Sequence, residues 1–262
     1  MARPADPHAK EALVAAARVE FAKKGLRGAR IEDVTAACGV SKGSFYLHFP
    51  SKEALFGELV SRFESAMGSC SSERLMKVRD FHANEGSVTS KDVAERTQRF
   101  LKMAELDLEA DLKVLELMWE YRDVVNVLFT GTQGTEFEGV AWKMMDSEED
   151  RIASDVKHYQ SAGACRTDIP PEVFGSMIVG TYTRVALRMN RMTQKPDMRE
   201  WAQSLQMLMR EGWTDRGAAQ GLQVPPDLHP LGRDKLPLPT GRTQKPRKKP
   251  VRATSGARRA AR

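Results

Sequence analysis

The sequence predicts an all-α protein with three parts: a three-helix helix-turn-helix unit in residues 1–50, a helical body in residues 51–213 and a basic tail in residues 214–262. Three observations lead to this prediction. Apolar residues recur at helical spacing through the first two parts, and strand-type alternation is sustained nowhere. A tight turn followed by a short helix is indicated near residue 40. The tail is rich in Pro, Gly and basic residues and poor in large apolar groups, so we expect it to be disordered.

Residues 39–55 have the pattern of the turn and second helix of a helix-turn-helix. Gly39 supplies the backbone freedom that a tight turn between helices needs, and Ser41 is a good N-cap for the helix that follows. Pro50 ends that helix and Ser51 caps the next one.

The short helix has two distinct faces on a wheel of ~100° per residue. Its outward face holds Lys42, Gly43, Tyr46 and Leu47. Phe45 and Phe49 form an apolar face that anchors the helix, with Ser44 and His48 at its flanks. In the major groove of DNA a lysine can reach guanine, a glycine permits close approach, a leucine can touch a thymine methyl and a tyrosine can bind a phosphate. The outward face therefore favours DNA as a partner.

Two preceding helices complete the predicted unit. Ile31, Val34 and Cys38 form one apolar stripe in residues 30–39. A first helix, residues 7–24, contributes a second stripe and ends at Gly25. We expect Cys38 to be a small buried residue.

The segment from about Leu13 to Phe56 resembles the DNA-binding domain of the TetR family of bacterial transcriptional regulators. The resemblance rests on the following residues in register: Ala16-Ala17, Phe21, Gly25, Ile31, Val34, Gly39 to Tyr46, His48-Phe49, Ser51-Lys52 and Leu55. Three residues depart from the usual pattern, since Arg30 replaces a small hydroxyl residue, and Thr35 and Cys38 replace Ala. Arg30 would add a charged contact to a phosphate.

The resemblance implies a role for each matching position of the second helix. Lys42, Gly43 and Leu47 match positions that face bases. Ser44, Tyr46, His48 and Lys52 match positions that hold the phosphate backbone. Lys52 also lies in the first turn of the next helix, whose amide end favours an anion. For His48, an ordinary solvated histidine is the alternative.

The formal net charge of +6 is unevenly distributed along the chain. Residues 233–262 carry eleven Lys or Arg and one Asp, residues 1–50 are net +3, and the residues between are net −7. A uniformly basic surface would have indicated nonspecific coating of DNA, whereas this pattern directs the N-terminal unit to DNA and the body elsewhere. The tail either binds phosphates nonspecifically or is a solvated terminus.

Composition and motifs predict a soluble cytoplasmic protein without metal or cofactor. The 41% hydrophobic content suffices for a packed core. No signal peptide is evident, and the longest apolar stretch, residues 173–183, is short of the ~20 residues that span a membrane. Cys38, Cys70 and Cys165 match no metal spacing and suggest a reducing compartment, although redox sensing stays open.

The body reads as helices throughout, with a possible kink at residues 68–72 and a break at residues 130–134. Ser90 is predicted to cap the helix that follows residues 84–90, and a further helix carries Leu112 to Trp119. A long helix is predicted for residues 135–161.

The last two helices are predicted to open at Pro170-Pro171 and at Pro196. The first bears small residues at Gly175 and Gly180, which would allow close approach of another helix. The TetR resemblance implies that these helices form a four-helix dimer interface with their copies. An ordinary intramolecular contact is the alternative.

The resemblance also implies a small-molecule pocket in the body whose occupancy moves the DNA-binding units of a homodimer apart. The candidates are aromatic, Met and Arg side chains: Trp119, Arg122, Phe129, Trp142, Met145 and Tyr182. Taken singly, each of them is better explained as a core residue, because aromatic and Met residues at helical spacing usually pack in a core. No ligand is assigned.

The predicted function is sequence-specific transcriptional regulation, as a repressor that a small-molecule effector releases from a palindromic double-stranded DNA operator. Two alternatives are a DNA-compacting protein without a ligand and an all-α ligand-binding enzyme. No Ser/His/Asp arrangement, metal spacing or Gly-rich phosphate loop favours the enzyme. Repression and activation are not distinguished by the sequence.

Overall fold

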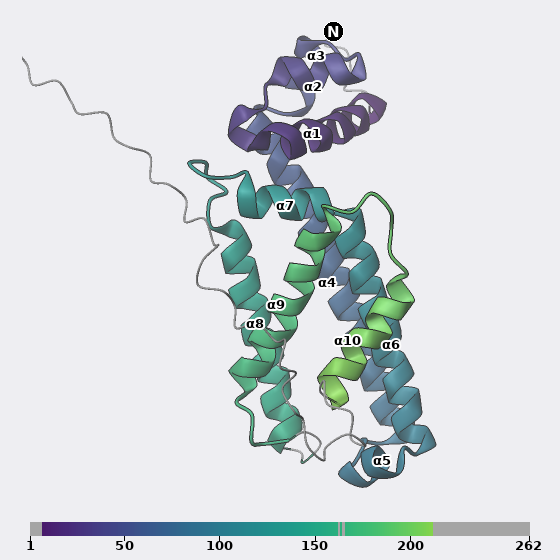
Figure 1. Ribbon diagram of the computed structural model, residues 1–262. Helices are drawn as coiled ribbons and strands as arrows, with labels where there is room; N and C mark the ends of the chain where they lie inside the picture. Colours follow the sequence, from purple (N-terminus) through teal and green to yellow (C-terminus); the bar gives the residue numbers. More distant parts are fainter. Residues whose placement is uncertain (1–6, 162, 164–165, 212–262) are drawn as a thin grey trace, which may run out of the picture. The chain divides into compact units, whose positions relative to one another are not determined.

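The computed structural model describes residues 7–161, 163 and 166–211. The chain divides into two units, Met1–Trp213 and Thr214–Arg262, and all described residues lie in the first. The described residues form ten α-helices and no strand, which confirms the predicted all-α class (Figure 1). The predicted tail and Cys165 lie outside the described residues. The helices are α1 (Pro7–Gly28), α2 (Ile31–Cys38), α3 (Lys42–His48), α4 (Lys52–Glu85), α5 (Ser90–Glu95), α6 (Gln98–Glu120), α7 (Arg122–Thr130), α8 (Val140–Ser161), α9 (Pro171–Met189) and α10 (Met198–Glu211).

The helices α1, α2 and α3 pack with the first turns of α4 around one buried cluster, and we call this part, residues 7–60, the head. Phe21, Val34 and Phe45 are at most 1% exposed there, and Phe21 meets Phe56 edge to face with 5.4 Å between ring centroids. The cluster continues beyond the head into α7 and α8, through Val124, Val127, Leu128 and Ala141. The head therefore shares one buried cluster with α7 and α8 of the remaining described residues, which we call the body.

The first helix is interrupted where the sequence predicts its end. Gly25 has φ 67° and ψ 169°, outside the helical region, before the chain adds a last turn up to Gly28. A positive φ favours glycine over residues with a side chain.

The helix α4 runs for 34 residues from the head into the body. Ser51 caps it as predicted, because its side chain accepts a hydrogen bond from the amide of Ala54 at 3.0 Å. The predicted kink at residues 68–72 is absent, since α4 continues through them. The hydroxyl of Ser69 donates to the carbonyl of Ser65 at 2.9 Å, so this small polar residue bonds within the helix.

After α4, the observed N-cap and the boundaries of the next two helices differ from the prediction. Thr89, not Ser90, is the N-cap of α5, and it forms a reciprocal capping box with Asp92. Asp92 also accepts a hydrogen bond from the hydroxyl of Thr97, the N-cap of α6. The chain therefore turns at Arg96, where φ is 50°, and α6 continues from Gln98 through residues that we had assigned to two helices.

Beyond α7 the predicted long helix starts later than expected, because residues 135–139 form turns before α8.

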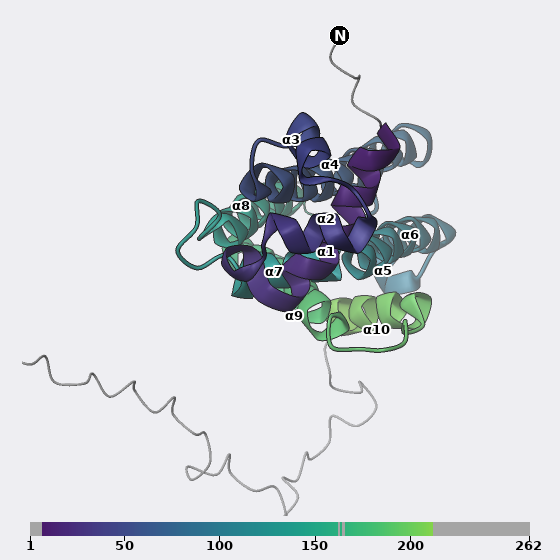
Figure 2. The same cartoon turned by 90° about the horizontal axis from the view of Figure 1, so that it is seen from above.

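The helix α6 packs against α4 and α10, while α8 and α9 form an antiparallel pair (Figure 1). The helix α7 lies against α1, and both views place it beneath the head (Figures 1 and 2). A second buried cluster holds the body together, with Phe63, Leu115, Tyr182, Ala186, Met189 and Ala202 among its members.

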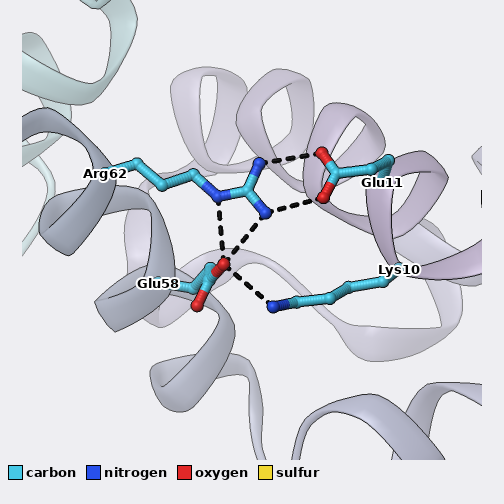
Figure 3. A network of polar contacts seen from close by, with 4 residues as sticks. All are labelled: Lys10, Glu11, Glu58 and Arg62. Carbon is cyan, nitrogen blue, oxygen red and sulfur yellow. Dashed lines mark hydrogen bonds and ion pairs between the residues drawn. The ribbon is translucent and has the colours of Figure 1, made fainter. Parts of the chain in front are cut away.

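Four charged side chains fix the start of α1 against α4 (Figure 3). The guanidinium of Arg62 donates to both carboxylate oxygens of Glu11, at 2.7 and 2.8 Å, and to Glu58. The ammonium of Lys10 donates to Glu58 at 3.0 Å. The bonds from Lys10 and Arg62 hold the pKa of Glu58 below its usual range.

In the described part of the chain no helix is both long enough and apolar enough to cross a membrane.

Candidate DNA-binding face and effector region

The turn between α2 and α3 has the geometry that its sequence predicts. Gly39 adopts the left-handed conformation, with φ 68° and ψ 18°, and its amide donates to carbonyls at the end of α2. Ser41 then caps α3, since its hydroxyl oxygen accepts the amide of Ser44 at 3.1 Å. These two caps allow α3 to start directly after the turn.

The two predicted faces of α3 are separated by burial. Phe45 is 0% exposed and Phe49 is 4% exposed, which confirms both as core residues. On the other face Tyr46 is 51% exposed and Leu47 is 57% exposed. A side chain added at Gly43 would meet only the hydroxyl of Ser41, at 3.8 Å. The outward face is therefore open and holds an apolar residue, Leu47, that is not part of the buried cluster of the head.

Lys42, which is predicted to face the bases, forms an ion pair within the protein. Its ammonium lies 2.5 Å from a carboxylate oxygen of Glu32 on α2, and both side chains are more than half exposed. The hydrogen bond from Lys42 lowers the pKa of Glu32, and the same bond raises the pKa of Lys42. An ion pair this exposed contributes little stability, so Lys42 can exchange Glu32 for another acceptor.

Lys52 has a structural partner that the sequence analysis did not identify. Its ammonium donates to the main-chain carbonyls of Arg27 and Ala29, at 3.0 and 2.9 Å. These carbonyls belong to the end of α1 and the residue after it, where a cation is favoured. Lys52 thus links the start of α4 to the end of α1, and its contact with a phosphate stays a prediction.

The other predicted phosphate contacts lie around the same face. Arg30 is exposed and is the N-cap residue of α2. Ser44 is half-buried, with its amide held by Ser41. His48 is half-buried and its Nε2 is enclosed without a hydrogen-bond partner, so a bond from His48 to DNA would use Nδ1 or a different rotamer.

The six effector candidates form two contact pairs and two separate residues. The guanidinium of Arg122 stacks 4.0 Å from the ring centroid of Trp119 and donates to its carbonyl. Phe129 meets Trp142 edge to face at 5.5 Å, and Trp142 is 61% exposed. Met145 is half-buried on α8.

Tyr182, the sixth candidate, lies in the second buried cluster, 7% exposed, and its hydroxyl has no partner in hydrogen-bonding geometry. Burial, and then the nearby carboxylate of Asp111, raise its pKa. Burial likewise raises the pKa of Asp111, which accepts a hydrogen bond from Gln206 of α10 at 2.7 Å. The sequence contained a signal for this group, because Asp111 lies on the stripe of Leu108 and Leu115.

Two open depressions in the surface of the described residues lie elsewhere. One, of about 510 Å³, is lined by residues of α1 and α7 that include Arg27, Asn126 and Gly131. The other, of about 500 Å³, lies between α1 and α2 and includes Val19 and Cys38. Neither is lined by the six effector candidates, so their grouping around one ligand stays a prediction.

The two glycines of α9 have different surroundings. A side chain added at Gly175 would lie 2.6 Å from the carbonyl oxygen of Glu149, so this glycine serves the contact with α8 inside the chain. Gly180 has no atom within 4 Å of an added side chain. It lies on the side of α9 that also exposes Val173 and Met177, and α10 exposes a second apolar pair, Met207 and Leu208. The helix that approaches Gly175 closely is therefore α8 of the same chain.

The comparisons with known proteins agree with this geometry. Residues 13–59 match the family of bacterial regulatory proteins, tetR family. The HTH-type transcriptional regulator YdgC of Bacillus subtilis is 32% identical over 87 residues, which are 33% of this chain and 40% of that protein. The HTH-type transcriptional repressor DhaR of a Mycobacterium species is 49% identical over 45 residues, 17% of this chain and 23% of that protein. The chain thus spans less than half the length of these relatives.

A solved structure extends the likeness to the body. The transcriptional regulator FadR from Bacillus subtilis, in complex with stearoyl-CoA, matches with a TM-score of 0.51 at 16% identity, and the match covers 78% of this chain and 99% of that chain. An identity this low establishes a common fold only. Residues 13–59 thus match the tetR family of bacterial regulatory proteins, and the described residues as a whole share the all-α fold of this solved structure.

Proposed function

We propose that this protein is a homodimeric, sequence-specific DNA-binding regulator that represses transcription from a palindromic operator and is released by a small-molecule effector. The observation that carries the proposal is the outward face of α3. Leu47 is 57% exposed beside Tyr46 and an open Gly43, while Phe45 and Phe49 anchor the helix. Such a face leaves apolar surface in water without serving the core, and it fits the major groove.

The dimer is supported by the apolar surface left on the last two helices. Val173 and Met177 of α9 and Met207 and Leu208 of α10 are 43–57% exposed. Two symmetric copies would bury these side chains, and a two-fold dimer would present two α3 helices to an inverted repeat. Gly180→Leu would obstruct this surface without touching the core, and we expect it to weaken both dimerisation and operator binding.

The effector is supported by buried polar groups in the body. The hydroxyl of Tyr182 is enclosed beside the carboxylate of Asp111 without ideal hydrogen-bond geometry, and burial raises the pKa of both groups. A desolvated polar group without a full set of partners is a candidate for ligand contact. Because the FadR structure contains stearoyl-CoA, an acyl-CoA is a reasonable first probe. If acyl-CoA leaves the complex with DNA intact, this effector class is excluded.

In the decisive experiment, the sequences that the full chain binds preferentially are selected from a library of random DNA duplexes. The preferred duplex is then footprinted with the bound protein. We expect an inverted repeat. Lys42→Ala should cost about 1–3 kcal/mol on that repeat and relax the preference at one base pair of each half-site. Arg79→Ala, which removes an exposed charge from the α4 segment of the body, should leave the selected sequence unchanged. Continuous protection without a preferred sequence would support DNA compaction instead.

A further inference from the structure

Besides the shared hydrophobic cluster, two features join the head to the body. One is α4, which runs from the head into the body. The other is a seam between α1 and α7, defined here by the contacts of Arg18 with Asp123 and of Gly25 and Leu26 with Gly131.

At one end of the seam Arg18 holds the start of α7. Its guanidinium donates to both carboxylate oxygens of Asp123, at 2.9 and 2.6 Å, and to the carbonyl of Glu120. It also lies 5.2 Å from the ring centroid of Tyr121. Both side chains of the Arg18–Asp123 pair are only about a quarter exposed. Paired hydrogen bonds of this kind fix orientation as well as distance.

At the other end the two backbones touch. The amide of Leu26 donates to the carbonyl of Gly131 at 2.9 Å. A side chain added at Gly25 would lie 3.1 Å from the carbonyl oxygen of Gly131, and one added at Gly131 would lie 3.1 Å from the Cα of Gly25. The nearest atoms to a side chain added at Gly25 all belong to the backbone of Gly131, which cannot move aside as the end of a flexible side chain would, so the approach depends on these glycines.

The two ends are about 10 Å apart along α1, at 1.5 Å per residue. Contacts at two separated points prevent the head from pivoting about either one. In a dimer the angle of each head determines the distance between the two α3 helices, and half-sites must match that distance along the groove.

We propose that the α1–α7 seam sets the spacing between the two half-sites that the dimer reads, with Gly131 and Asp123 as positioning residues. This inference rests on the proposed function. It concerns the gap between half-sites, whereas the α3 face concerns the sequence within each half-site.

Gly131→Ala is the sharpest test. Gly131 has φ −122°, which any residue adopts, so the added methyl acts by its contacts with Gly25 and Val127 rather than through backbone strain. Asp123→Asn removes the charge that Arg18 holds and adds no volume. Gly57→Ala is the matched control, because its methyl would meet Phe137 on the body at an ordinary 3.5 Å.

The full-length variants are measured on duplexes that carry the selected inverted repeat with its gap shortened, unchanged or lengthened by single base pairs, and on a single half-site. For Gly131→Ala and Asp123→Asn we expect the preference for the best gap over its neighbours to fall at least roughly fivefold, the low end of typical coupling between sites. Single half-site affinity and the Gly57→Ala control should not change.

Circular dichroism establishes which variants are folded, and Asp123→Asn decides the matter if Gly131→Ala does not fold. A wild-type gap preference that the folded variants keep, or an equal loss at every gap, overturns the inference alone. A wild-type chain without any gap preference overturns the proposed function and this inference with it.

Discussion

The outward face of α3 and the six candidate effector residues differ in how clearly the exposure of a side chain distinguishes a binding role from a packing role. In α3 the adjacent residues Phe45 and Leu47 are 0% and 57% exposed. In the effector region Tyr182 is buried, Trp142 is exposed, and both touch other parts of the protein. In α3 the exposed Leu47 stands beside the exposed Tyr46, opposite two buried aromatic residues, so the helix has a distinct outward face. In a helical body an aromatic residue has many core positions available, and its presence alone indicates little.

The largest expected effect contrasts the two faces of α3. Phe45→Ala should destabilise the head by about 3–5 kcal/mol, because a fully buried ring is lost from its core. Leu47→Ala should leave the free energy of unfolding almost unchanged and lower operator affinity. Urea unfolding and DNA binding of both variants test the contrast. Similar losses of stability in the two variants would contradict the division into faces.

Lys52 tests whether a predicted DNA contact also has a packing role. Lys52→Met should destabilise the protein by about 1 kcal/mol, because the carbonyls of Arg27 and Ala29 lose their donor. Lys42→Met, which loses only an exposed ion pair, should not. If Lys52→Met keeps full stability and only lowers the salt dependence of DNA binding, by about one counterion per subunit, Lys52 acts on phosphate alone.

The network of Figure 3 gives a pH-dependent contrast within the head. The pKa of Glu58 is lowered in the folded state, so its stabilising effect is complete at neutral pH and is lost as the pH falls through that lowered pKa. Glu58→Gln should reduce stability at pH 7 by up to ~1 kcal/mol, since the network is partly exposed. Thermal unfolding from pH 7 to pH 2 should show the two proteins converging. A constant difference would mean that the carboxylate charge is unimportant.

Gly43 should give the smallest change, with the opposite sign. Gly43→Ala should stabilise α3 by roughly 0.5–1 kcal/mol, because alanine has the higher helix propensity and the methyl has room. The same methyl should weaken operator binding if DNA approaches the backbone there. A variant that is more stable and binds equally well would remove Gly43 from the interface.

Local signals in the sequence predicted the head well. The cap at Ser41, the turn at Gly39 and the burial of Phe45 each follow from a few neighbouring residues, and all are present. The body was predicted less completely. The double use of Asp92 by the caps of α5 and α6 joins residues eight positions apart, and the seam joins Arg18 to Asp123 across the chain. Contacts between distant residues leave no periodic pattern in a single sequence.

The continuous core described above limits how the head can be exchanged between chains of this fold. Val124, Val127 and Leu128 of α7 pack in the same cluster as Phe21 and Phe56 of the head. A chimera joined near residue 50 would combine side chains from two different proteins within that cluster, even though the junction itself lies in a short loop. A head transplanted from this protein should therefore carry its own α7, and the outward surface of α3 is more safely changed by substitutions at its exposed positions than by exchanging the whole head.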